Sequence, residues 1–192
     1  MVPRHVGPLQ LAGDEAEVLD TTEGLDDPRL TPVRRDLQPY GPILVRRVAV
    51  GDSPDALVVA HPDHRADLEV LEHELAPAIE AVSTVWGTGW NRAPVVVVAG
   101  TPTEFTALTR SAGLAAGTDV AAVSLTGSYP PGTEPTDQRI VFNPDARRRV
   151  GSEGLATLLR HELTHVATRA VTTDGAPLWM LEGYAEYVAQ RA

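Results

Sequence analysis

The stretch that decides the fold and its chemistry reads Leu159-Arg160-His161-Glu162-Leu163-Thr164-His165. It lies inside the strongest helical pattern of the chain, which we predict to run from about residue 152 to 170. A Gly-Ser pair at 151–152, followed by a glutamate in the first turn, is typical of a helix start. In such a helix His161 and His165 are one turn apart and share a face, so both imidazoles can reach one ion.

The spacing His-Glu-x-x-His is a signature of zinc sites. Glu162 is about 100° around the helix from His161, which places its carboxylate beside a metal and not on it. Zinc lowers the pKa of a coordinated water towards about 7, and a neighbouring carboxylate can accept the proton that this water loses. The motif therefore predicts His161 and His165 as metal ligands and Glu162 as general base.

A catalytic zinc site needs a third protein ligand and one open position. A third histidine in the extended form of the motif is excluded, because Val171 stands at its place. Asp174, in a turn-like Thr-Asp-Gly triplet, is one alternative. The other is a glutamate on the next helix, which we predict at about 177–190 because proline is favoured as the first residue of a helix.

That next helix carries Glu182 and Glu186 one turn apart, on one face. Apolar neighbours predict that this face is at least half buried, and two carboxylates there need a compensating cation. We therefore expect Glu182 to be the third ligand. Glu186 is expected to accept a hydrogen bond from the ring N–H of His161 and so to orient that ligand.

The rest of the chain predicts one domain over residues 43–192. Strands are expected at 43–50, 56–60, 94–99, 120–126 and 138–142, and two further helices at 62–86 and 103–112. This order predicts an α+β (mixed α/β) domain with a small twisted sheet backed by helices. Residues 1–42 hold six of the sixteen prolines and several acidic clusters. They are expected to form an N-terminal arm without regular structure.

Composition excludes several classes of function. The 192 residues carry a net charge of −10 and contain no cysteine. Thiol chemistry and cysteine metal sites are therefore absent, and the acidic balance argues against nucleic acid as a partner. No stretch approaches the roughly 18 apolar residues of a membrane span, and no signal peptide is recognisable. We expect no membrane insertion by this chain.

The His161–His165 motif, followed by Trp179-Met180-Leu181-Glu182-Gly183-Tyr184-Ala185-Glu186-Tyr187, resembles the gluzincins, the zinc peptidases that include thermolysin. The pair of segments is more closely similar to the peptidase-MA-like domains of actinobacteria. The resemblance implies a zincin-like fold, one Zn²⁺ ion and a peptide or protein substrate. It also implies that His161, His165 and Glu182 are the ligands and suggests an extracytoplasmic location.

Two further roles follow from the resemblance. The strand that precedes the motif helix would form the rim of the cleft, where the substrate adds as an extra strand; its residues are Arg139, Ile140, Val141 and Phe142. Tyr129, in the loop before it, is the candidate for stabilising the oxyanion. The function predicted is a zinc-dependent endopeptidase; the alternative is a catalytically weak zinc-binding module that binds a peptide strand or protein partner.

Overall fold

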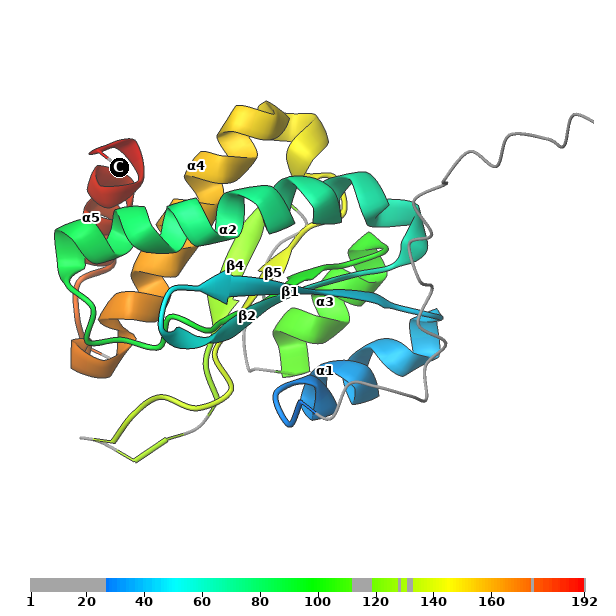
Figure 1. The fold of residues 1–192 in the computed structure, drawn as a ribbon, viewed down its shortest axis with the longest axis horizontal. Helices are drawn as coiled ribbons and strands as arrows, with labels where there is room; N and C mark the ends of the chain where they lie inside the picture. The colour runs from blue at the N-terminus through cyan, green and yellow to red at the C-terminus, as the bar shows by residue number, and fades with distance from the viewer. Residues whose placement is uncertain (1–26, 112–118, 128, 131–132, 174, 192) are drawn as a thin grey trace, which may run out of the picture.

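The fold is built on one mixed sheet of five strands in the order β1-β2-β3-β5-β4 (Figure 1). The computed structural model describes residues 27–111, 119–127, 129–130, 133–173 and 175–191. The strands are β1 (Leu44–Val50), β2 (Ser53–Ala60), β3 (Val95–Val98), β4 (Ala122–Leu125) and β5 (Arg139–Phe142). Pairs β2–β3 and β3–β5 are parallel, whereas β1–β2 and β4–β5 are antiparallel.

Helices cover both faces of the sheet, which makes the domain α+β with three layers (Figure 1). The helices are α1 (Leu30–Leu37), α2 (Arg65–Trp86), α3 (Pro102–Ser111), α4 (Ala146–Thr168) and α5 (Leu178–Arg191), with short 3₁₀ turns η1 (Gln38–Tyr40), η2 (Pro62–His64) and η3 (Arg169–Val171). Buried side chains of α2, α4 and α5 form one core with the sheet, and those of α1 and α3 form a second core on the opposite face. All four valines of β3 are buried because helices lie on both sides of it.

The N-terminal segment differs from the sequence prediction. Residues 1–42 were predicted as an arm without regular structure, yet residues 30–37 form helix α1. Leu30, Val33 and Leu37 are fully or almost fully buried and belong to the second core. Their three- and four-residue spacing gives this short helix one apolar face, so burial against the sheet stabilises it despite Pro32. The domain therefore begins before residue 43, while residues 1–26 lie outside the described part of the chain.

The strand that precedes α4 is not an edge strand, so that prediction was wrong. β5 pairs with β3 on one side and with β4 on the other, so that Val141 has Val97 and Val123 as its two neighbours. The reason is that β4, which precedes β5 in the chain, pairs antiparallel with it on the side away from β3. β4 therefore takes the outermost position of the sheet. The edge of the sheet beside α4 is therefore β4.

Helix α4 changes direction at Gly151, whose φ of 74° and ψ of 176° are not helical. A positive φ of this size is readily adopted only by glycine. The segment that follows, from Ser152, carries the His-Glu-x-x-His motif, in agreement with the predicted helix start. Within the described residues, no helix has both the length and the apolar character needed to cross a bilayer.

Candidate metal centre

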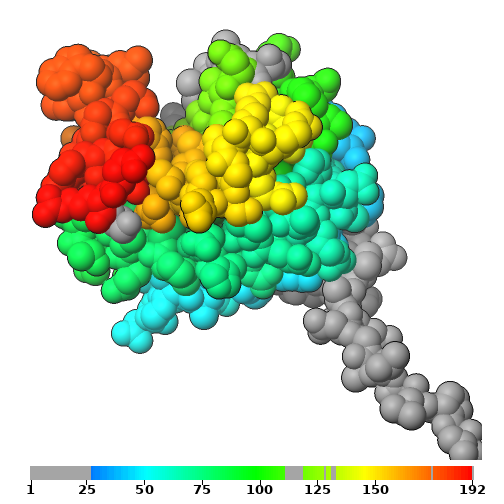
Figure 2. Space-filling model, turned by 90° about the horizontal axis from the view of Figure 1, so that it is seen from above, coloured from blue at the N-terminus to red at the C-terminus, as the bar shows by residue number. Residues whose placement is uncertain are grey.

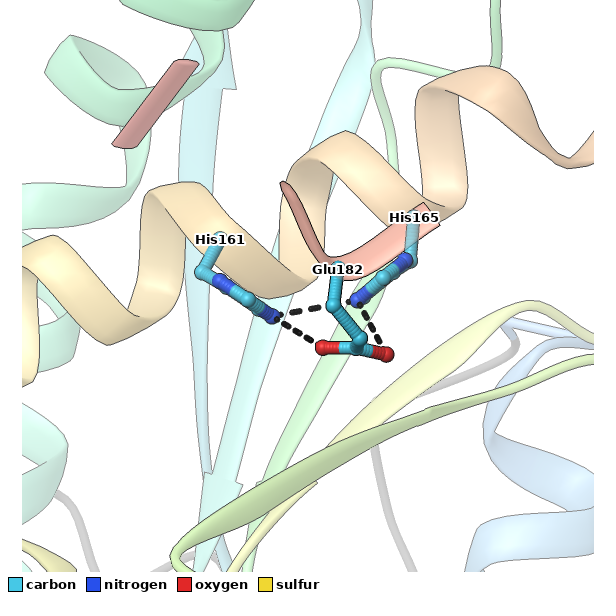
Figure 3. Close-up of side chains that lie close together, drawn as sticks. All are labelled: His161, His165 and Glu182. Atoms are coloured by element: carbon cyan, nitrogen blue, oxygen red, sulfur yellow. Dashed lines mark hydrogen bonds and ion pairs between the residues drawn. The ribbon is translucent and has the colours of Figure 1, made fainter. Parts of the chain in front are cut away.

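The two motif histidines lie side by side on one flank of α4, where each is partly buried (Figure 3). Leu155, Leu159 and Leu163 of the same helix are fully or almost fully buried and fix its opposite face against the core. The ring Nε2 atoms of His161 and His165 are 3.1 Å apart, and the ring planes are inclined by 74°. Both rings therefore present the same nitrogen to one point in space.

Glu182 of α5 completes this group from a second helix (Figure 3). Its Oε2 atom is 3.2 Å from Nε2 of His161, and its Oε1 atom is 3.7 Å from Nε2 of His165. Ligands held at 2.0–2.1 Å around a tetrahedral zinc are about 3.3 Å from one another. The 3.1 and 3.2 Å separations are close to that value, and the 3.7 Å separation involves the second carboxylate oxygen, so these three side chains could hold a zinc ion.

Packing between α4 and α5 sets this geometry. Ala185, Val188 and Ala189 of α5 are fully buried, and the Nε atom of Arg160 donates a 3.0 Å hydrogen bond to the backbone carbonyl of Ala189. Small residues at two of these positions allow the helices to approach closely. In the described part of the chain, His161, His165 and Glu182 form the single group of three or more potential metal-binding side chains with donor atoms within 4.8 Å of one another.

Glu186 lies beside His161, but not at the hydrogen-bonding distance that its predicted role requires. Its Oε2 atom is 3.6 Å from Nδ1 of His161, and its other oxygen accepts a 3.0 Å hydrogen bond from Gln190. The prediction of a half-buried face was wrong, because the side chains of Glu182 and Glu186 are 52% and 60% exposed. Solvent therefore screens the repulsion between these two carboxylates. The sequence argument that their burial requires a compensating cation does not hold.

Glu162, in contrast, is buried on the inner side of the same turn, with 5% of its surface exposed. Burial and then the nearby charge of Glu182 raise the pKa of its carboxyl to about 7, while hydrogen bonds from the backbone and hydroxyl of Ser124 act in the opposite direction. Ser124 belongs to the edge strand β4. A carboxyl with this pKa can both accept and return a proton near neutral pH.

The protonation state of His165 also suits a ligand. Burial, and then the neighbouring His161, lower the pKa of its imidazole below the usual value, against the opposing effect of Glu182. Metal ligands must be neutral imidazoles, so the ring is already close to its binding form at neutral pH.

Tyr129, the residue predicted to stabilise the oxyanion, makes its contacts away from the candidate ligands. The hydroxyl of Tyr129 donates a 3.2 Å hydrogen bond to the backbone carbonyl of Arg169, and the guanidinium of Arg169 lies 5.3 Å from the centre of the tyrosine ring. These contacts attach Tyr129 to the first residue of η3, and its hydroxyl does not contact the three candidate ligands in this structure. Asp174, the alternative third ligand, lies outside the described residues.

Sequence reasoning missed Ser124 altogether. Its contact with Glu162 joins a strand to a helix that are distant along the chain, and a lone serine in a short strand carries no local signal of such a contact. Arg139, Ile140, Val141 and Phe142 are present as predicted in one strand, but that strand lies inside the sheet.

Comparison with models of known protein families, with curated proteins and with solved structures found no match to this chain. The resemblance to gluzincins therefore stays a prediction that depends on the two motif segments. The geometry of the His-His-Glu group is an independent argument for a metal centre, because it follows from the packing of α4 against α5.

Proposed function

We propose that the protein is a zinc-dependent endopeptidase of the gluzincin type that hydrolyses peptide or protein substrates. The observation that carries the proposal is the combination of two imidazole nitrogens 3.1 Å apart, a carboxylate whose two oxygens are 3.2 and 3.7 Å from them, and a buried carboxyl one residue from His161. Surface ion pairs between histidine and glutamate are common, but they do not place a buried acid with a raised pKa beside them. This pairing of an open site with a proton acceptor is what hydrolysis requires.

In this proposal His161, His165 and Glu182 hold the metal, and Glu186 orients His161 through Nδ1. Bound zinc would supply a Lewis acid that polarises the substrate carbonyl and acidifies a water molecule. Glu162 accepts a proton at its carboxylate and later returns it to the leaving amine. Its burial keeps bulk water from competing for that proton.

The substrate is proposed to pair with β4, which replaces the strand expected from the sequence. β4 lies at the edge of the sheet, next to α4, and Ser124 at its centre contacts the carboxyl of Glu162. A peptide added along β4 would receive main-chain hydrogen bonds and pass beside the candidate base. Ser124 would then help to hold the carboxylate in place.

The alternative is a zinc-binding module that binds a peptide strand or protein partner and cleaves poorly. The contact that favours it is the hydrogen bond from Tyr129 to Arg169, which engages the hydroxyl proposed for the oxyanion. A site that binds zinc but leaves the transition state without a donor would be a weak catalyst.

The deciding experiment measures zinc content and peptide hydrolysis for the wild type and Glu162→Gln. The endopeptidase requires about one zinc per chain in both proteins and cleavage of casein by the wild type alone. Zinc in both without cleavage by either supports the module. No stoichiometric zinc in either protein contradicts both functions.

A second comparison tests the third ligand. Glu182→Ala is expected to weaken zinc binding by about 1.4 kcal/mol or more, which is tenfold or more in affinity, whereas Asp174→Ala should leave it unchanged. The reverse result would assign the third position to Asp174.

A further inference from the structure

The first turn of α5 exposes large apolar side chains to solvent. Leu178 is 70% exposed and Trp179 is 76% exposed, the largest fraction among the exposed large apolar residues of the described chain. Burial of apolar surface stabilises a protein by about 25 cal/mol for each Å² removed from water. An exposed tryptophan ring makes no such contribution. Contiguous exposed apolar side chains, in contrast to ones scattered singly, are a feature of binding surfaces.

These side chains lie on the same side of α5 as the candidate metal ligand. Trp179 and Leu178 precede Glu182 by three and four residues, so they are within about 60° and 40° of it around the helix. Tyr187, which is 47% exposed, is about 140° away and belongs to another face. The exposed apolar pair is therefore a continuation of the surface that carries Glu182.

The shape of the molecule places this surface beside a cleft. Figure 2 shows α5 (red) and the connection before it (orange) as a lobe at one end of the molecule. A notch separates the lobe from the yellow-green region around β4. The lobe that contains α5 and the region around β4 thus lie on opposite sides of this notch (Figure 2).

The exposed side chains themselves indicate the chemistry of what binds there. An apolar side chain placed against this turn would cover Leu178 and Trp179 and remove apolar surface from water. Since the turn adjoins the candidate metal ligands, its occupant is expected to be part of the same peptide that reaches them.

We propose that Leu178 and Trp179 form a specificity surface that holds a bulky apolar side chain of the peptide substrate next to the metal centre. This inference depends on the proposed function and adds the class of substrate. Trp179 supplies a flat, rigid contact area, and Leu178 borders it one position earlier on the helix. Peptides with a large apolar residue at one position near the cut are the expected substrates.

Cleavage-site profiling on a diverse peptide library tests the inference. The zinc-loaded wild type should enrich large apolar residues at one position near the cut. Trp179→Ala should lose that enrichment and about tenfold in kcat/KM on the preferred peptides, mainly through KM, with less than a twofold change on peptides that carry serine there. Tyr187→Ala is the matched control, because it removes an exposed aromatic ring from another face of α5. An unchanged profile for Trp179→Ala would overturn the proposal.

Binding provides a readout that does not require turnover. In the Glu162→Gln background, calorimetry with a preferred peptide should show a Kd about tenfold weaker when Trp179→Ala is added, while zinc content and Tm stay the same. Equal affinity with and without Trp179 would contradict the inference while leaving the endopeptidase intact. Zinc-loaded wild type that cleaves no peptide would remove the endopeptidase, and with it the role of Trp179 in cleavage. If sedimentation shows that Trp179→Ala converts a dimer into a monomer, the surface joins two copies and the proposal fails.

Discussion

The Nε2 atoms of His161 and His165 face each other at 3.1 Å. Only one hydrogen fits between two ring nitrogens at this distance, so the pair cannot carry two protons there without repulsion. The charge of His161 accordingly adds to the effect of burial in lowering the pKa of His165. A divalent cation can replace that single shared proton and satisfy both lone pairs together with the carboxylate of Glu182.

Zinc should therefore stabilise the folded chain, and the effect should depend on these two rings. At a free zinc concentration of 100 times Kd, the free energy of unfolding is expected to rise by about 2.7 kcal/mol. Thermal melts with zinc and with a chelator measure the change. His161→Ala should abolish the shift. His73→Ala is the control, because that ring is 82% exposed and lies on α2; an equal loss of the shift in this variant would argue against a specific site.

Glu162 should make the metal-free protein less stable as the pH rises. Its pKa is about 7 in the folded chain, against 4.5 as the reference value. Between these two pH values the folded state holds a proton that the unfolded state has released, so stability falls with rising pH across this window. Above pH 7 the loss amounts to about 3 kcal/mol.

Urea unfolding at pH 4.5 and pH 8, for the wild type and Glu162→Gln in the presence of a chelator, measures this loss. The variant should be the more stable protein at pH 8, and the difference between the two should shrink towards pH 4.5. The lowered pKa of His165 acts with the opposite sign in both proteins, so the difference between them isolates Glu162. A variant that follows the pH dependence of the wild type would contradict the assignment of a buried, proton-accepting carboxyl.

Local periodicity was sufficient to predict most helices and the grouping of His161, His165 and Glu182. The i, i+4 spacing of His161 and His165 and a short connection to the next helix bring Glu182 to the same point, and these are features that sequence carries. The position of β5 was not predictable in this way, because a strand reveals its buried faces but not the identity of its neighbours. α1 was missed because its one apolar face spans only eight residues in a proline-rich segment, and burial against the sheet, not propensity, stabilises it.

The integration of α1 into the domain can be measured directly. Leu30 is fully buried in the core formed with α3. Leu30→Ala is expected to lower the free energy of unfolding by about 2–5 kcal/mol, as in other cores where a leucine is truncated. Arg35→Ala, on the exposed side of the same helix with 76% of its side chain in solvent, should change it by less than about 0.5 kcal/mol. Equal, small effects would mean that α1 is not part of the cooperative unit.

A second buried acid–base pair lies away from the metal centre, where His61 meets Glu104. The Nδ1 atom of His61 donates to the carbonyl of Pro42 at 2.8 Å, and Nε2 is 2.9 Å from Oε1 of Glu104. The other carboxylate oxygen accepts a 3.0 Å hydrogen bond from the backbone N–H of Gly100. Since the carbonyl can only accept, the proton between Nε2 and Oε1 is the one that this pair gains or loses.

The pKa of His61 is raised, chiefly by the hydrogen bond to Glu104 and against the effect of burial. The folded chain therefore keeps this proton above pH 6.5, where the unfolded chain releases it. Stability from the pair is fully present below pH 6.5 and is lost as the pH rises through the folded pKa. Unfolding free energies between pH 7 and pH 9 should fall more steeply for the wild type than for Glu104→Gln, which removes the acceptor charge. Glu74→Gln is the matched control, because Glu74 pairs at 3.0 Å with the exposed His73 and should leave the wild-type slope unchanged. A slope in Glu104→Gln as steep as that of the wild type would mean that the alkaline loss of stability arises elsewhere.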